Sequence, residues 1–399
     1  MATNKVLMYQ MYPMCWGSLK NMEAHLRKVK ELGCTHVWLS PFFVSPGFDH
    51  GYDVSDYCDV DEKYGSLRDF DSFVKKAHSF KLKVVLDLVM NHTSTFHSWL
   101  NDYPDFYIWA DEPNAWTNWF DGQSAWTKHA GKDKYFCHMF SAEQADLNWF
   151  PDGEHINEQL VSAFQSVVSF WEERGVDGFR LDAIQAINKD FEKEELSLGD
   201  MLIGDKACKV INAVFPDKDA QFILAECLDV SPRGDAVRYY LENSNISCCN
   251  NILLKDSISD GLISFMEKAY EYCQIPGFML ELESHDSPRF TSRSHLDGKG
   301  VFQFMFTTPT NFICLYNGQE LGLKNPTKEE LPDAKLLHLD VQSKMRYDAG
   351  EPMSAIRPLS RANARVKYPT KEWTRQAALP NSALLWCKYY TKEWKNRKK

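Results

Sequence analysis

Short apolar runs alternate with amphipathic stretches along most of the chain. The apolar runs are almost continuous rather than alternating in polarity, which is typical of parallel strands that helices cover on both faces. They predict eight strands, at Val6–Tyr9, Thr35–Leu39, Val84–Val89, Gly178–Leu181, Phe222–Ala225, Cys248–Ile252, Phe278–Leu282 and Phe312–Leu315. Apolar residues spaced three and four apart predict helices between them, at Met22–Leu32, Leu67–Phe80, Ile156–Arg174, Ile258–Tyr272 and Ser382–Lys395.

This rhythm of strand and helix predicts an α/β fold, a (β/α)8 TIM barrel. The alternation of strands and helices stops after the third strand. From Thr93 to Glu154 the chain is rich in Trp, Asp, Asn, Pro and Tyr, so a small loop-rich inserted domain is expected there. We therefore predict a barrel domain in two parts, residues 1–92 and 155–399, around an inserted domain at 93–154. A doubly wound open sheet is the alternative. It is less favoured because Tyr9–Pro13, and not a glycine-rich phosphate loop, follows the first strand.

Charge and composition limit the partners. The 399 residues carry a formal net charge of −10, so a nucleic-acid partner is not expected. No run of about 18 apolar residues predicts a membrane span, and no apolar run after Met1–Lys5 predicts a signal peptide. The 11 cysteines show no CxxC spacing, which favours reduced thiols and a cytoplasmic protein.

Polar side chains follow four of the predicted strands at the point where each strand ends. In a barrel, these ends meet at one mouth, where ligands bind. The residues are Asp87, Asn91 and His92 at the third strand, Arg180 and Asp182 at the fourth, Glu226 at the fifth, and His285 and Asp286 at the seventh. The sequence thus predicts carboxylates, two imidazoles and one guanidinium at a single mouth.

The fourth and fifth strands carry a pattern that fits glycoside hydrolysis. Arg180 and Asp182 lie two residues apart in a strand, so both side chains leave the same face and can pair. The cation is expected to keep Asp182 ionised, as a nucleophile must be. Glu226 follows an apolar run without a charged neighbour in sequence, so a raised pKa is expected, which suits a general acid. Two carboxyl groups in opposed environments indicate a retaining mechanism. A buried Arg–Asp pair that only stabilises the barrel is an equal alternative at this point.

Two further interpretations concern other polar residues at the mouth. A zinc site is conceivable from the two histidines with a carboxylate, that is, from His92 and His285 with Asp87 or Asp286. No HExxH pairing on a helix supports it, so it is less favoured. Glu281 and Glu283 lie two apart and share a face, which makes them competing acids.

The four strand-end segments, taken together and in this order, resemble those of the α-amylase superfamily, glycoside hydrolase family 13. They read Asp87-Leu-Val-Met-Asn91-His92, Gly178-Phe-Arg180-Leu-Asp182, Glu226 after its apolar strand, and His285-Asp286. The resemblance extends from about Val6 to Leu323. It implies an eight-stranded barrel with a domain inserted after the third strand, where the composition also changes.

The resemblance also implies roles for the charged residues. Asp182 corresponds to the nucleophile and Glu226 to the general acid and base. Asp286 corresponds to a third carboxylate that binds sugar hydroxyls and favours ring distortion in the transition state. Arg180 corresponds to the residue that orients the nucleophile.

Further residues correspond to the family's sugar-binding positions. The resemblance implies that His92 and His285 bind hydroxyls of the sugar being cleaved. Within Asp49–Asp53, it implies that Tyr52 stacks on that sugar and that Asp49 helps to close the pocket; a core ring and a surface turn are the alternatives for these two. The residues that shape the site are Asp87 and Asn91.

Three further features concern the branch of the family that the chain resembles and its departures from the family pattern. Gln144–Asn148 resembles a segment of the oligo-1,6-glucosidase and neopullulanase-like branches, and the small Ala183 resembles members that act on α-1,4 bonds. The loop Pro13–Lys20 lacks an acidic calcium-binding run, so no metal and no cofactor is expected. A β-sandwich domain after the barrel is not evident. The barrel faces are therefore expected to be covered by Lys324–Arg375 or by a second subunit of a homo-oligomer.

The resemblance implies a retaining α-glycoside hydrolase that acts on α-glucosidic bonds of oligosaccharides, preferentially α-1,4 bonds, through a covalent glucosyl-enzyme. One alternative is a 4-α-glucanotransferase or a trehalose-forming transglycosidase or isomerase that uses the same residues. Another is a non-catalytic sugar-binding or structural barrel.

Overall fold

The computed structural model describes residues 5–339 and 341–397. Within that part of the chain, eight parallel strands form one sheet in the order β13-β12-β11-β5-β2-β1-β15-β14. A parallel bridge between Cys249 on β13 and Phe278, the residue before β14, nearly closes the barrel. The strands are β1 (Val6–Met11), β2 (His36–Leu39), β5 (Lys83–Val89), β11 (Gly178–Asp182), β12 (Phe222–Cys227), β13 (Cys248–Asn251), β14 (Met279–Glu281) and β15 (Phe312–Tyr316). The prediction of a (β/α)8 barrel is confirmed.

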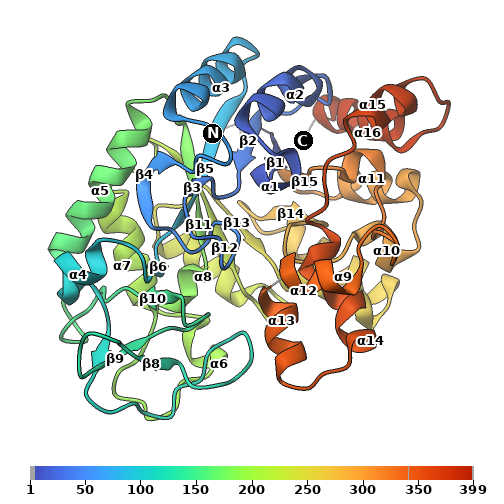
Figure 1. The fold of residues 1–399 in the computed structure, drawn as a ribbon. Coiled ribbons are helices and arrows are strands. Elements are labelled where there is room, and N and C mark those ends of the chain that lie inside the picture. The colour runs from blue at the N-terminus through green and yellow to red at the C-terminus, as the bar shows by residue number, and fades with distance from the viewer. Residues whose placement is uncertain (1–4, 340, 398–399) are drawn as a thin grey trace.

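Helices surround this sheet (Figure 1). The longer ones are α2 (Leu19–Glu31), α3 (Leu67–Ser79), α5 (Glu158–Glu172), α7 (Asp205–Val214), α8 (Asp235–Asn243), α9 (Leu262–Cys273), α11 (Gly298–Thr307) and α16 (Ala383–Asn396). Capping explains where α2 begins: the Ser18 side chain accepts a hydrogen bond from Asn21 N, so the helix starts three residues before the predicted Met22. None of the helices in the described residues is both long enough and apolar enough to cross a bilayer.

The inward face of the strands changes from apolar to polar towards their carboxyl ends. A buried cluster contains one or two residues of each of seven barrel strands, including Val85, Leu224 and Cys248. Two residues further along, the same faces carry Asp87, Glu226 and Asn250, because side chains in a strand repeat every second residue. The apolar layer fills the barrel, and the polar layer forms the floor of its mouth.

The segment between β5 and α5 has its own small elements. They are β6 (His92–Ser94), α4 (Trp99–Asp102), β7 (Trp109–Ala110), β8 (Trp126–Lys128), β9 (Tyr135–Cys137) and β10 (Gln144–Asp146). β7, β9 and β8 form an antiparallel sheet, and β10 pairs antiparallel with β6, which brings the chain back to the end of β5. A separate buried cluster lies here, around Trp116, Trp126 and Met139. The limits 93 and 154 of an inserted domain stay a prediction.

Shorter elements complete the connections. They are α1 (Pro13–Trp16), β3 (Phe43–Val44), β4 (Asp56–Val60), α6 (Leu198–Met201), α10 (Phe290–Ser294), α12 (Asp333–Leu339), α13 (Val341–Asp348), α14 (Met353–Ile356) and α15 (Thr370–Ala377). In Figure 1, α12, α13 and α14 lie together, on the opposite side of the mouth from the β7–β9 sheet. Part of the segment Lys324–Arg375, proposed above as a cover for the barrel, thus lies at its mouth.

Position 178, at the start of β11, requires glycine because the backbone of the neighbouring strand lies very close to it. A Cβ atom at this position would lie 2.0 Å from the carbonyl oxygen of Phe222 on the neighbouring strand. We expect Gly178→Ala to lower the free energy of unfolding by about 1–3 kcal/mol, because the strands must separate to admit the methyl group. Denaturant unfolding measures this. Gly131→Ala is the control, since a Cβ there meets nothing nearer than 3.5 Å; equal losses in both variants would contradict the prediction.

Candidate active site

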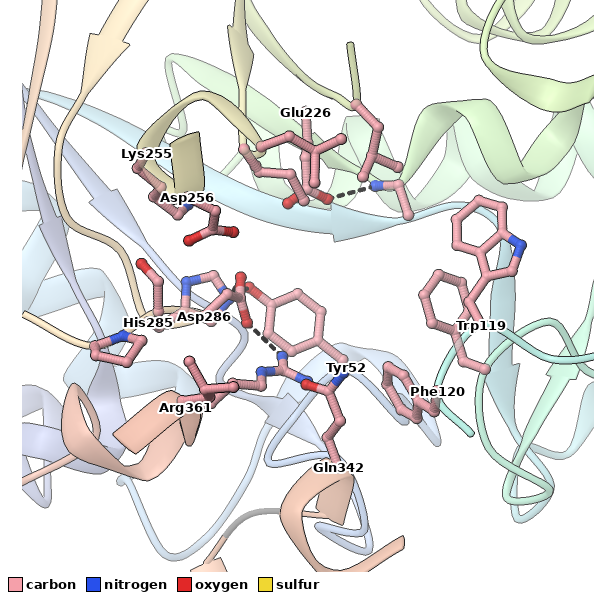
Figure 2. Close-up of a pocket in the computed structure, with 18 of the residues that line it drawn as sticks. Tyr52, Trp119, Phe120, Glu226, Lys255, Asp256, His285, Asp286, Gln342 and Arg361 are labelled. Carbon is pink, nitrogen blue, oxygen red and sulfur yellow. Dashed lines mark hydrogen bonds and ion pairs between the residues drawn. The ribbon is translucent and has the colours of Figure 1, made fainter. Parts of the chain in front are cut away.

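A cavity of about 840 Å³ opens at the carboxyl ends of the strands. It is lined by seven of the residues predicted from sequence, namely Asp49, Tyr52, His92, Asp182, Glu226, His285 and Asp286. Figure 2 labels four of them, Tyr52, Glu226, His285 and Asp286. The other three predicted residues, Asp87, Asn91 and Arg180, are buried and contact residues that line the cavity. The sequence therefore identified residues that the fold brings together.

Arg180 lies at the centre of the cavity floor and contacts three carboxyl groups. Its Nη1 donates to Asp87 Oδ1 at 2.7 Å and to Asp182 Oδ1 at 2.5 Å, and its Nη2 lies 2.6 Å from Glu226 Oε1. The guanidinium is 1% exposed. Asp182 and Glu226 thus lie on two nitrogens of one planar cation and face the same cavity.

Burial decides the protonation of these carboxyl groups. It raises the pKa of Asp87 to about 6 and the pKa values of Asp182 and Glu226 to about 7 each, while Arg180 acts in the opposite direction. The expectation that Arg180 keeps Asp182 fully ionised is wrong, because desolvation outweighs one shared cation. The raised pKa of Glu226 agrees with expectation. However, the fold places Arg180 next to Glu226, which has no charged neighbour in sequence, so the expectation of opposed environments for the two carboxyl groups is wrong.

Asp286 has the opposite electrostatic setting. Burial opposes its ionisation, yet Arg361, His285 and Arg365 together lower its pKa well below the usual range. Arg361 pairs with Asp286 Oδ1, Arg365 Nη2 lies 3.2 Å from the same atom, and His285 Nε2 lies 2.9 Å from Oδ2. Asp286 is therefore a permanent carboxylate in the wall of the cavity.

His285 is a neutral ring in a fixed orientation. Burial lowers its pKa to about 3. Gln10 Nε2 donates to Nδ1 at 2.9 Å, so the ring proton lies on Nε2, the nitrogen that faces Asp286. The ring is parallel to that of Tyr52, with centroids 5.2 Å apart, and the Tyr52 hydroxyl donates to Asp87 Oδ2 at 2.9 Å. Tyr52 is thus held rigidly with its ring at the cavity.

Asp49 and His92 lie on the side of the cavity formed by the loop before β4 and by β6. Burial raises the pKa of Asp49 to about 6 against the opposing effect of two arginines, and burial lowers the pKa of His92 to about 3. Gln144 Nε2 on β10 contacts both side chains, at 3.2 Å from Asp49 Oδ2 and 3.1 Å from His92 Nε2. His92 is therefore neutral, whereas Asp49 is mostly ionised at neutral pH.

A lysine side chain contacts the oxygen atoms around Asn91. Lys189 Nζ donates to Asn91 Oδ1 at 2.7 Å and to the Ala186 carbonyl, and it lies 3.0 Å from Asp146 Oδ2. An ammonium group thus lies where these oxygens converge, and the arrangement does not fit a calcium ion. Within the described residues, no group of three or more His, Cys, Asp or Glu side chains could hold a metal, so the zinc alternative finds no support. That the protein uses no metal stays a prediction.

The two competing acids have other partners. Glu281 Oε1 lies 3.3 Å from Lys255 Nζ, and Glu281 Oε2 accepts from Asn250 at 3.1 Å. Glu283 is fully buried against Arg289 at 3.0 Å. Neither glutamate lines the cavity.

The sequence did not reveal several residues that contact the site. They are Gln10 on β1, Lys189 after β11, and Arg361 and Arg365 after α14. Arg361 and Arg365 lie 75 and 79 positions from Asp286. They lie in a stretch without periodicity or motif, so no local pattern could assign them.

Comparisons with known proteins agree on one family. The family model "Alpha amylase, catalytic domain" matches residues 9–223, more than half of the chain. The chain is 37% identical to an α-glucosidase of Pediococcus pentosaceus in an alignment 406 positions long, which covers 86% of this chain and 70% of the relative. It is 41% identical to a trehalose-6-phosphate hydrolase of Escherichia coli over 203 residues, which cover 46% of this chain and only 36% of that enzyme.

Solved structures have the same fold. The crystal structure of a trehalose-6-phosphate hydrolase of Bacillus licheniformis superposes with a TM-score of 0.82 at 26% identity, covering 99% of this chain and 84% of that one. A trehalulose synthase of Pseudomonas mesoacidophila gives a TM-score of 0.84 at 22% identity, covering 98% of this chain and 84% of that one.

The raised pKa of Glu226 predicts a pH-dependent effect on stability. Between pH 4.5 and 7 the folded protein holds a proton that the unfolded chain releases, so this group destabilises the fold increasingly as pH rises. Glu226→Gln should therefore be more stable than the wild type above pH 7, by on the order of 3 kcal/mol, and the gain should vanish below pH 4.5. Unfolding curves at pH 4, 6 and 8 measure it, with exposed Glu242→Gln on α8 as control. A gain independent of pH would contradict the prediction.

Proposed function

Because the chain belongs to the α-amylase family, we propose that it is a retaining glycoside hydrolase that cleaves α-glucosidic bonds of oligosaccharides. The observation that carries this proposal is the placement of Asp182 and Glu226 on one guanidinium at one cavity. A retaining mechanism needs two carboxyl groups that can reach the same glycosidic bond.

The proposed reaction has two steps. Asp182 attacks the anomeric carbon and forms a glucosyl ester, while Glu226 protonates the glycosidic oxygen and the leaving group departs. Glu226 then takes a proton from water, the hydroxide attacks the anomeric carbon, and the ester bond to Asp182 breaks. Each carboxyl group returns to its initial state, and the anomeric configuration is retained.

The protonation of the pair fits this reaction. With both pKa values near 7, the pair carries one proton over a range around neutral pH. The productive form has Asp182 ionised and Glu226 protonated. At low pH the nucleophile becomes protonated and at high pH the acid is lost, so a bell-shaped dependence of kcat/KM on pH is expected.

The surrounding residues are assigned to sugar binding. Asp286, held ionised by Arg361 and Arg365, accepts hydrogen bonds from sugar hydroxyls. His285 and His92 are neutral and bind hydroxyls, and Arg180 orients Asp182. Tyr52 is assigned to contact with the sugar ring. Asp49 is assigned to closing the cavity behind that ring. Asp87 and Asn91 shape the site through Arg180 and Lys189.

For the linkage, we propose α-1,4 bonds. The support is Ala183, a small residue that lines the cavity directly after Asp182. Its left-handed backbone, with φ 41°, also favours a small side chain. Transfer to a sugar acceptor instead of water uses the same glucosyl ester, so it is the second candidate. A non-catalytic barrel is not favoured, because the carboxylates are present and face the cavity.

Substitution of the two carboxyl groups should have different effects. Asp182→Ala should abolish turnover of every α-glucoside, because no ester can form. Glu226→Gln should slow maltose hydrolysis by about 10²–10⁴-fold but α-glucosyl fluoride much less, because fluoride leaves without protonation. Steady-state kinetics measure both, with exposed Asp71→Ala on α3 as control. Equal losses of Glu226→Gln on both substrates would overturn its assignment as the acid.

Linkage preference and the fate of the glucosyl group can be read from products. The wild type should release glucose from maltose with a kcat/KM about tenfold or more above that for isomaltose, since small misfits in such a pocket cost this much.

Chromatography of maltotriose digests tests transfer. Free glucose as the main early product supports hydrolysis, whereas longer oligosaccharides without glucose would favour the transferase alternative.

A further inference from the structure

The cavity continues past the catalytic carboxyl groups on the side of Glu226. A volume of about 840 Å³ is near the upper end of those that bury a drug-sized ligand, so the cavity has room for more than one sugar ring. A general acid protonates the oxygen of the leaving group, so that group, the aglycone, must lie on the Glu226 side. The wall on that side therefore decides which aglycone fits.

The strand next to that of Glu226 leads directly into this wall. β13 pairs with β12, and Ile252, the residue after β13, donates its backbone N–H to the Cys227 carbonyl at 3.0 Å. A 3-10 helix, η3 (Leu254–Asp260), begins two residues later. Its Asp256 lines the cavity, and Figure 2 shows the Asp256 carboxylate directed into it. The barrel thus places a carboxylate on the aglycone side.

The Asp256 carboxylate is fixed on one side and open on the other. Arg293 Nη1 donates to Asp256 Oδ1 at 3.0 Å, and no other cationic side chain of the described residues lies within ion-pair distance of this carboxylate. The Asp256 side chain is 54% exposed, whereas that of Arg293 is 17% exposed. One oxygen is therefore held by the guanidinium, and the other faces the space that an aglycone would fill.

Two further side chains of this wall have polar atoms without a partner in the described part of the chain. Arg293 Nε and Nη2 are buried and make no hydrogen bond, and the same is true of Ser287 Oγ. Ser287 directly follows Asp286 and is 2% exposed. Arg293 and Ser287 both line the cavity. Because buried polar groups normally have partners, this wall has unused capacity for hydrogen bonds.

Aliphatic side chains complete the wall. Leu228, Ile252 and Leu253 also line the cavity. A sugar ring has apolar C–H faces and a rim of hydroxyl groups, so a wall of this kind with one carboxylate fits a sugar. An alkyl group would cover the aliphatic part but would remove water from Asp256 without replacing its hydrogen bonds, which is unfavourable for a charged group.

We propose that Asp256, held in place by Arg293, binds hydroxyl groups of the leaving sugar and makes the aglycone site selective for a sugar. This inference rests on the proposed hydrolysis of α-glucosidic bonds and assigns to the same site a residue that distinguishes between aglycones. Asp256 accepts hydrogen bonds from the hydroxyls, and Arg293 is the positioning residue that fixes the carboxylate.

Two substrates that differ only in the leaving group test the proposal. The leaving group of maltose is a second glucose, whereas that of α-glucosyl fluoride has no hydroxyl. Asp256→Ala should lower kcat/KM for maltose about 10- to 100-fold, as expected for lost hydrogen bonds to a charged group, and that for α-glucosyl fluoride less than about twofold. A loss for maltose that does not exceed the loss for the fluoride by about fivefold overturns the proposal.

Asp260→Ala is the matched control. Asp260 also lies in η3, is 55% exposed and pairs with a cation, Lys268 at 2.8 Å, but it does not line the cavity. This variant should keep the wild-type kcat/KM for both substrates. Should Asp256→Ala not fold by circular dichroism, Asp256→Asn gives the same comparison.

Variants of Arg293 test its positioning role. Arg293→Met should show the same selective loss for maltose, because nothing then fixes the carboxylate. Arg293→Lys retains a cation and should recover part of that loss. Loss for α-glucosyl fluoride in equal measure would show a general structural role of Arg293 and overturn the assignment.

Maltose analogues that lack one hydroxyl of the leaving glucose assign the contact to Asp256 itself. In the wild type, at least one analogue should react about fivefold or more slowly than maltose, and in Asp256→Ala the same analogue should react as fast as maltose. Losses that add fully in the variant would mean that Asp256 does not contact these hydroxyls, which overturns the proposal.

The aglycone inference and the proposed function can fail separately. Turnover of α-glucosyl fluoride by the wild type requires the nucleophile but no leaving sugar. Turnover of the fluoride together with parallel losses in Asp256→Ala overturns the role of Asp256 alone. No turnover of the fluoride or of any α-glucoside overturns the proposed function, and the inference with it.

Discussion

One buried guanidinium organises the floor of the mouth. Arg180 contacts Asp87, Asp182 and Glu226, which come from three neighbouring strands of the barrel. Removal of Arg180 would leave three buried acids without their cation, which is strongly destabilising. Arg180 thus fixes the positions of the three carboxyl groups. Because one cation cannot compensate three buried anions, it also leaves the group short of positive charge, and burial then raises each pKa.

The same cavity contains a carboxylate with the reverse balance. Asp286 has two arginines and a neutral histidine around one anion, so it stays ionised, whereas burial raises the pKa values of Asp182 and Glu226 to about 7. Carboxyl groups held in different protonation states by their surroundings are typical of acid–base chemistry at neutral pH. This arrangement has a cost in stability, since the charged form of Glu226 is disfavoured by burial, and such costs are common at functional sites.

The sequence predicted the barrel well because strands buried on both faces are apolar without interruption, and this pattern is local. It also identified the strand-end residues, because a strand places its last polar side chains at the mouth. It could not predict the ionisation of Asp182, because Arg180 is visible two residues away whereas burial and the contact between Arg180 and Glu226 arise only from the fold. Arg361 and Arg365 were missed for a related reason: they reach Asp286 from a segment whose pattern has no period.

Floor and walls of the cavity come from different parts of the chain. The floor depends on the register of β5, β11 and β12, which hydrogen bonds along the whole strands hold in place. The walls come from the segment between β5 and α5, from α6 and from the segment after α14, so they can change without moving the carboxyl groups of Asp182 and Glu226. Leu228 and Ile252 belong to the walls, yet each directly follows a barrel strand. The sheet itself therefore sets the distance of this part of the wall from Glu226.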